Sequence, residues 1–235
     1  HNAIAMVRRM GIKSDLPAVP SLALGTPSLS VMEMVGAYSV LANDGVYKEP
    51  VYLTSIANQQ DETLQLFRQE QKPVRALSKQ STQMMIHMLK SVVSEGTGAA
   101  LRYKYGITND VVGKTGTTQS NVDGWFIAVM PKLVIGTWVG ADDPRMHFSS
   151  TALGQGAATA LPIVAKFIKY ANQDKELNTR MWAKFEPLSE DLRRRMDCKR
   201  SKSNKNLFER IFRKNKKKSV KVTKFRNRKD KNSTP

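Results

Sequence analysis

The chain has 235 residues, of which 40% are hydrophobic, and a formal net charge of +18. This length is sufficient for one domain with a substantial core. The charge is unevenly distributed: residues 1–192 carry 19 Lys and Arg against 17 Asp and Glu, whereas residues 193–235 carry 19 against 3. A nearly neutral first part is not typical of a nucleic-acid-binding domain. We therefore expect a folded domain over residues 1–192 and a basic, disordered tail over residues 193–235.

Metal, disulfide and membrane-spanning classes are not supported by the sequence. Cys198 is the single cysteine and His87 and His147 stand alone, so we expect no disulfide within the chain, no metal site and no cofactor. No run of apolar residues approaches the ~18 that a membrane-spanning helix needs. His1 stands where an initiator Met is usual, and the next residues already follow a helical pattern. We interpret the chain as a fragment that begins inside an element.

Two helices are predicted in the first 45 residues. Apolar residues at helical spacing over residues 3–10 end at Gly11, which is a frequent helix terminator. Ser30 and Glu33 have the spacing of a capping box, in which each side chain accepts a hydrogen bond from the other residue's backbone. The apolar face that follows stops at residues 43–45, Asn-Asp-Gly.

A hairpin and a long helix are predicted next. Strand-like runs over residues 51–56 and 63–67 flank a polar Asn-Gln-Gln-Asp segment, which indicates a β-hairpin. A helix is expected from Ser78, with apolar residues at helical spacing, and Gly96-Thr97-Gly98 ends it. Such a helix would cover one face of a sheet.

The central sheet is expected to follow residue 110. We predict an antiparallel meander of the strand that contains Lys114 and the strands at residues 124–129 and 133–139. Their apolar density favours helices on both faces of the sheet. The small-residue segment from Gly154 is predicted to open a final helix that continues to Tyr170. The expected fold class is α+β, an antiparallel sheet covered by helices.

The polar stretch of the first of these strands is the candidate site. Lys114 supplies a positive charge, Thr115 and Thr117 supply hydroxyl donors at alternate positions, and Gly116 leaves room for a ligand backbone. The stretch therefore predicts an anion-binding strand edge.

A family resemblance rests on this stretch. Lys-Thr-Gly is one of three signatures of penicillin-binding proteins and serine β-lactamases, together with S-x-x-K and S-x-N. Its continuation is more specific, and it resembles the end of the transpeptidase domain of class A penicillin-binding proteins. The resemblance includes residues 111–145, VVGKTGTTQSNVDGWFIAVMPKLVIGTWVGADDPR, and extends to residues 21–50, SLALGTPSLSVMEMVGAYSVLANDGVYKEP, and 154–168, GQGAATALPIVAKFI. It implies that residues 1–192 are the C-terminal part of a transpeptidase domain, with the fold that penicillin-binding proteins share with serine β-lactamases.

The resemblance implies peptidoglycan D,D-transpeptidation, which is acyl transfer through a serine ester between stem peptides in cell-wall synthesis. Lys114 and Thr117 occupy catalytic positions, with the Thr117 N–H as an oxyanion donor. Thr115, Gly116, Thr117 and Thr118 occupy substrate-binding positions, and Trp125 is a weaker candidate for which core packing is the alternative. The implied partners are the stem peptide and β-lactam antibiotics, with no nucleic acid.

The other two signatures are missing. No serine has lysine three positions later, and none has asparagine two positions later. Because the family order places both motifs before Lys-Thr-Gly, we expect them upstream of His1, and we expect the fragment itself to be inactive. The resemblance also implies an upstream glycosyltransferase domain and an upstream membrane segment that anchors the protein at the extracytoplasmic face of the bacterial cytoplasmic membrane.

Three other functions share single features with this sequence. Gly113-Lys114-Thr115 resembles part of a phosphate-binding P-loop. A P-loop, however, has four residues between its first glycine and its Gly-Lys pair, whereas six separate Gly106 from Gly113, and a loop instead of a helix follows the lysine. The basic tail suggests a nucleic-acid-binding module, although its aromatic residues are sparse. A D,D-carboxypeptidase or a β-lactamase-like hydrolase shares Lys-Thr-Gly and the fold. Transfer to water and transfer to an amine are not distinguished by the sequence.

Overall fold

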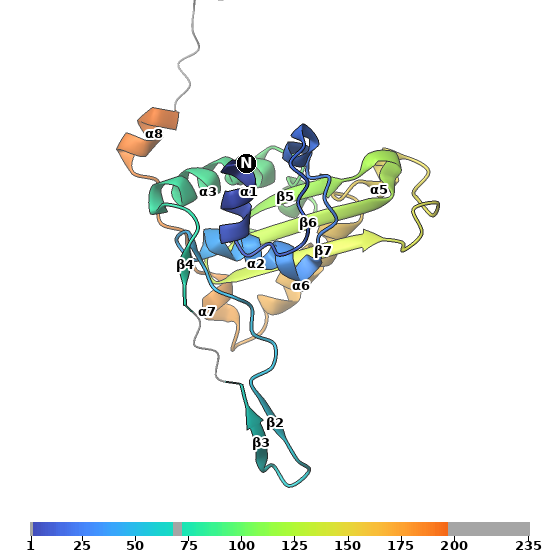
Figure 1. Cartoon of the computed structure of the whole chain (residues 1–235). Helices are drawn as coiled ribbons and strands as arrows, with labels where there is room; N and C mark the ends of the chain where they lie inside the picture. Colours follow the sequence, from blue (N-terminus) through green and yellow to red (C-terminus); the bar gives the residue numbers. More distant parts are fainter. Residues whose placement is uncertain (1, 68–71, 197–235) are drawn as a thin grey trace, which may run out of the picture. The chain divides into compact units, whose positions relative to one another are not determined.

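The computed structural model describes residues 2–67 and 72–196 (Figure 1). Its helices are α1 (Asn2–Arg9), η1 (Pro20–Leu24), α2 (Val31–Ala42), α3 (Lys79–Ser94), α4 (Ala100–Tyr103), η2 (Gln119–Asn121), α5 (Thr151–Gly154), α6 (Ala160–Ala171), α7 (Asn178–Met181) and α8 (Glu190–Met196). Its strands are β1 (Val46–Tyr47), β2 (Ser55–Ala57), β3 (Thr63–Leu66), β4 (Val74–Arg75), β5 (Val112–Thr117), β6 (Asp123–Met130) and β7 (Leu133–Gly140). Within these residues, none of the helices combines the length and apolarity that crossing a membrane requires.

The central sheet consists of β5, β6 and β7, in that order, and all its neighbours are antiparallel (Figure 1). Lys114 of β5 pairs with Ile127 of β6, and Ile127 pairs with Gly136 of β7. The predicted meander is thus confirmed. Among the described strands β5 has a neighbour on one side only, so the polar stretch lies at a sheet edge.

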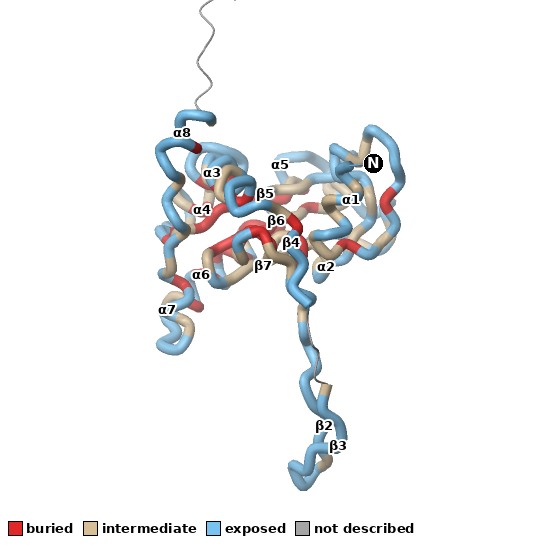
Figure 2. Tube along the Cα trace, turned by 60° about the vertical axis from the view of Figure 1, so that its left-hand side comes forward, coloured by how far each residue is buried: buried red, intermediate tan, exposed pale blue. Residues whose placement is uncertain are grey.

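Both faces of the sheet are covered, as the apolar strands predicted. On one face, Leu41 of α2 and Ile86 and Leu89 of α3 pack with Val112, Ile127 and Val129. On the other face, a hydrophobic cluster joins α6 with alternate residues of β6; its α6 members are Ala160, Leu161, Val164, Ala165, Ile168 and Ala171. Figure 2 shows these buried segments in red. The α+β fold class is confirmed, and burial of the two faces supplies its main stabilisation.

The predicted hairpin is present but shorter on its first side. β2 pairs antiparallel with β3, and the predicted strand over residues 51–56 is wrong over its first four residues. All residues of both strands are exposed (Figure 2). Because neither strand packs a face against the domain, only the residue pairs next to the turn adopt strand structure. The pairing of β1 with β4, which joins segments on either side of this hairpin, was not predicted.

The helix predicted from Gly154 as the final one begins later than predicted, and it is not the last, because α7 and α8 follow it. Helical structure is interrupted after Gly154 and resumes at Ala160, so residues 155–159 form a connection instead of the first turns. The physical reason is close packing, because a Cβ on Gly156 would overlap backbone atoms of the central sheet. The domain boundary predicted at residue 192 stays a prediction. Helix α8 runs across it, and residues 197–235 of the predicted tail lie outside the described residues.

The capping box at the start of α2 is confirmed and has additional partners. Ser30 Oγ accepts a hydrogen bond from the Glu33 N–H, and Glu33 Oε2 accepts one from the Ser30 N–H, both at 3.2 Å. Glu33 also accepts hydrogen bonds from the Ser14 hydroxyl at 2.7 Å, the Ser14 N–H at 2.8 Å and the Lys13 N–H at 2.9 Å. These donors, with the Ser14 hydroxyl first, lower the pKa of Glu33 from 4.5 to about 2.

This carboxylate predicts an acid-sensitive attachment between α2 and the segment after α1. Because the pKa of Glu33 is lower in the folded than in the unfolded state, its contribution to stability is complete above pH 4.5 and is lost as the pH falls towards about 2. We expect Glu33→Gln to lower the urea midpoint of the chain at pH 7 and to flatten its decline between pH 4.5 and 2. Exposed Glu176 provides the control substitution Glu176→Gln. An unchanged pH slope in Glu33→Gln would contradict the assignment.

Candidate active site

The polar stretch of β5 places its side chains on two faces of the sheet edge. Because side chains alternate along a strand, Lys114 shares a face with Val112, whereas Thr115 and Thr117 share the other. Val112 and Gly113 are buried, Thr115 and Gly116 are half-buried, and Lys114 and Thr117 are exposed. The strand therefore runs from the core into solvent at the residues predicted to bind substrate.

Lys114 carries a positive charge at the open edge of the sheet. Its Nζ donates a hydrogen bond to the carbonyl oxygen of Thr115 at 2.6 Å. Within residues 2–67 and 72–196, no carboxylate lies close enough to form an ion pair with this ammonium group. The charge is therefore available to an anion at this edge.

The two threonine hydroxyls each contact another part of the chain. The Thr115 and Thr97 hydroxyl oxygens lie 2.7 Å apart, and either residue can donate the hydrogen bond. Thr117 Oγ1 accepts a hydrogen bond from the Gly156 N–H at 3.2 Å. Neither Thr97 nor Gly156 was predicted as a site residue. Gly96-Thr97-Gly98 was interpreted only as a helix terminator, and no sequence spacing indicated that its threonine reaches β5.

A side chain at Gly116 would crowd a neighbouring strand. A Cβ at this position would lie 3.0 Å from the Cβ of Trp125, its cross-strand partner. A Cβ on Gly156 would in turn overlap the carbonyl oxygens of Gly116 and Trp125. Two glycines thus allow the connection between α5 and α6 to cross the end of β5 and β6 at backbone distance. Trp125 itself packs against the hydrophobic cluster beneath α2 and α3.

Thr118 begins the loop between β5 and β6. Its hydroxyl oxygen accepts a hydrogen bond from the Asp123 N–H at 3.1 Å, and its own N–H donates to the Asp123 carbonyl at 3.3 Å. Within the loop Ser120 and Asn121 have φ values of 59° and 56°, a region that asparagine adopts more readily than serine. The Thr118 oxygen therefore closes the loop, and its hydroxyl proton and second lone pair are left to contact a ligand.

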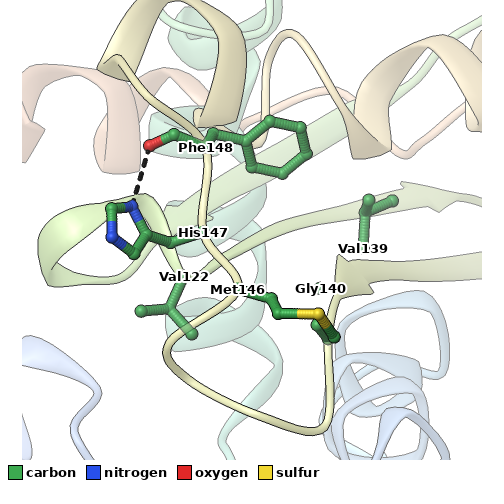
Figure 3. A pocket seen from close by; sticks show the side chains of 7 residues that line it. Val122, Val139, Gly140, Met146, His147 and Phe148 are labelled. Carbon is green, nitrogen blue, oxygen red and sulfur yellow. Dashed lines mark hydrogen bonds between the residues drawn. The ribbon is translucent and has the colours of Figure 1, made fainter.

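A cavity of about 290 Å³ lies at the same end of the sheet (Figure 3). It is lined by Val122, Val139, Gly140, Ala141, Met146, His147 and Phe148. The strand register places Val139 in line with Gly124 and Thr117, so the cavity lies near the exposed end of β5. Its walls are mostly apolar, and its lining includes none of the predicted site residues. His147 Nδ1 lies 3.2 Å from the Phe148 carbonyl oxygen.

The described residues thus form an edge that can hold an anion by charge and hydroxyl donors. Among them, no three His, Cys, Asp or Glu side chains are grouped closely enough to bind a metal ion. Lys114, Thr115, Gly116 and Thr117 are brought together on one short strand, and Thr118 follows it directly.

Comparison with protein families finds a match to the penicillin-binding protein transpeptidase domain over residues 17–168. Among curated proteins, penicillin-binding protein 1A of Aquifex aeolicus is 36% identical over 178 residues, which cover 72% of this chain and 23% of that protein. The chain therefore spans about a quarter of the length of this relative.

Solved structures show the same fold at lower identity. Penicillin-binding protein 1A from Haemophilus influenzae superposes with a TM-score of 0.63 at 23% identity, covering 77% of this chain and 31% of that one. The PonA1 protein from Mycobacterium tuberculosis, solved in complex with penicillin V, superposes with a TM-score of 0.58 at 20% identity, covering 73% and 50%. These likenesses support the fold, and the family match supports its assignment.

Proposed function

The chain belongs to the penicillin-binding protein transpeptidase family, on its class A branch, and we propose that its complete gene product is a serine D,D-transpeptidase of peptidoglycan. The family acts in cell-wall synthesis. The observation that carries the finer proposal is the open edge of β5, where Lys114, Thr115 and Thr117 present a positive charge and two hydroxyl donors within four residues. A peptide that ends in a free carboxylate fits this edge.

The proposed reaction divides between this chain and residues outside it. A serine Oγ attacks the carbonyl carbon of the penultimate D-alanine, the peptide C–N bond breaks, and D-alanine leaves with the proton that the serine lost. The amine of a second stem peptide then attacks the ester and releases the serine. Neither S-x-x-K nor S-x-N occurs in the 235 residues, so the proposal places the serine and its base outside this sequence.

Residues of β5 hold the substrate in this scheme. Lys114 keeps the site electropositive and hydrogen-bonds the serine of S-x-N, the hydroxyls of Thr115 and Thr117 bind the terminal carboxylate, and the Thr117 N–H stabilises the oxyanion that forms on the attacked carbonyl. Gly116 lets the peptide backbone lie against the strand, and Thr118 contacts its end. An anion held by an ammonium group and hydroxyl donors is recognised without a metal.

β-Lactams are the second class of ligand in the proposal, because they combine a carboxylate with a reactive amide. The PonA1 protein, which shares the fold, was solved with penicillin V. We place the complete product at the extracytoplasmic face of the cytoplasmic membrane, where its peptidoglycan substrate is, with a membrane anchor and a glycosyltransferase domain upstream of this sequence.

Covalent labelling tests the proposal. The gene is sequenced upstream of the His1 codon, and its complete product is incubated with a fluorescent penicillin, with the 235-residue chain as the control. We expect S-x-x-K followed by S-x-N upstream, labelling of that serine, and an unlabelled control chain. A complete product that does not react would refute the function. Release of D-alanine from a stem peptide, measured with and without an amine acceptor, separates crosslinking from hydrolysis.

A further inference from the structure

We propose that Thr97, which lies outside the Lys-Thr-Gly motif, is a positioning residue that orients the Thr115 hydroxyl towards the substrate carboxylate. The proposal rests on the function proposed above and adds a residue from a different element to the site. Thr97 lies in the turn after α3, and it is 18 positions from Thr115 in the sequence. We call Gly96-Thr97-Gly98 the threonine turn.

The direction of the hydrogen bond between the two hydroxyls decides what Thr115 can do. A hydroxyl has one proton to donate and two lone pairs that accept. If Thr115 donated to Thr97, its proton would be used within the protein and would be unavailable to an anion. If Thr97 donates, the Thr115 oxygen is held at 2.7 Å and its proton points elsewhere. Binding of a carboxylate therefore requires Thr97 to be the donor.

Thr117 provides an independent example of the same arrangement. Its oxygen accepts a hydrogen bond from the Gly156 backbone N–H, and a backbone amide can only donate. The Thr117 proton is therefore free for a ligand. Thr115 and Thr117 lie on the same face of β5. With Thr97 donating to the Thr115 oxygen and Gly156 to the Thr117 oxygen, both hydroxyl protons remain available to one anion. A hydroxyl that accepts a hydrogen bond also becomes a stronger donor.

The threonine turn is held rigidly enough for this role. The Gly96 N–H donates to the Ser91 carbonyl and the Gly98 N–H to the Val92 carbonyl, both at 2.8 Å. Gly98 is buried, and a Cβ there would lie 3.1 Å from the Val92 oxygen and 3.4 Å from the ring of Phe126.

Phe126 packs between the threonine turn and β5. It is fully buried in the centre of the sheet, and it is the cross-strand partner of Thr115. A Cβ on Gly113 would lie 2.9 Å from its ring. The ring therefore packs beside Gly98 of the turn and Gly113 of β5, which ties both segments to the same buried side chain. The position of Thr97 opposite Thr115 follows from this packing.

The test compares two forms of one β-lactam on the complete gene product. The rate of acylation is measured with a penicillin and with its methyl ester, which lacks the negative charge. We expect Thr97→Val, which keeps the shape and removes the hydroxyl, to lower the ratio of the two rates about 3- to 10-fold, the size of one net hydrogen bond. Thr97→Ser restores the ratio. Ser94→Ala, at the end of α3, is the matched control and leaves the ratio unchanged.

A double-mutant cycle with Thr115→Val distinguishes positioning from a separate effect. If Thr97 acts through Thr115, the double variant has the ratio of Thr115→Val alone. The proposal is overturned if Thr97→Val slows both forms equally, or if the two substitutions act additively on the ratio. Thr97 is exposed, so the fold is expected to tolerate its replacement, and Thr97→Ala gives a second variant without the hydroxyl. A wild-type product that does not react with penicillin would refute the proposed function itself.

Discussion

Replacing Lys114 by alanine will slow acylation of the complete gene product by penicillin by about 30- to 5,000-fold. The ammonium group stands at the open edge of β5, and its hydrogen bond in the described structure is to the Thr115 carbonyl. A bound carboxylate would face this charge, and removing one partner of a hydrogen-bonded charge pair costs about 2–5 kcal/mol. The measurement is the second-order rate constant for labelling by a fluorescent penicillin.

Two further variants make the Lys114 result specific. Lys114→Arg keeps the charge, and we expect it to retain part of the rate, because guanidinium also pairs with carboxylates but is longer and planar. Lys132→Ala removes an exposed lysine from the turn between β6 and β7 and should leave the rate unchanged. A rate in Lys114→Ala within twofold of the wild type would exclude the proposed role in binding the carboxylate.

Replacing Asn109 by alanine will destabilise the domain by about 3 kcal/mol. Asn109 is fully buried and forms a reciprocal amide pair with Asn172: Asn109 Nδ2 donates to Asn172 Oδ1 at 2.8 Å, and Asn172 Nδ2 donates to Asn109 Oδ1 at 2.9 Å. Asn109 Nδ2 also donates to the Met181 carbonyl at 2.8 Å. The substitution leaves these partners unpaired in the interior, at about 1–3 kcal/mol for each buried group. The urea midpoint of the 235-residue chain measures the loss.

A control for the Asn109 prediction lies on the segment that contains its partner Asn172. Asn178 is exposed and donates to the Asn172 carbonyl at 3.3 Å, so Asn178→Ala should change stability by less than about 1 kcal/mol. Equal effects of the two substitutions would show that the amide pair does not hold the segment from Asn172 to Met181 against Asn109. The result also concerns the site, because Asn109 lies three residues before β5.

Local patterns in the sequence identified several elements correctly because neighbouring residues determine them. Ser30 and Glu33 predicted the start of α2, since a capping box needs only residues three apart. Short, densely apolar runs predicted the strands of the meander, and the family resemblance is confirmed by the match over residues 17–168. The start of α6 was misplaced because small residues after Gly154 are compatible with a helix as well as with close packing against a sheet.

The roles of single residues at the site follow only in part from the sequence. The order Lys-Thr-Gly-Thr placed a charge and two hydroxyls on one strand, and the strand is β5 as expected. That β5 lies at the edge of the described sheet, with Lys114 on one face and Thr115 on the other, depends on which strands pair. The catalytic and substrate-binding assignments of these residues stay predictions that the labelling experiments test.

The sequence by itself determined the family, the position of the stretch predicted to bind an anion, and the elements whose signals lie within one or two turns. Only the tertiary structure decided which distant groups contact each other: Thr97 with Thr115 and Gly156 with Thr117 at that stretch, and Asn109 with Asn172 before β5. These pairs are 18, 39 and 63 positions apart. Periodicity and capping rules describe interactions between residues close in sequence, whereas such contacts arise when packing of the two sheet faces brings separate segments together.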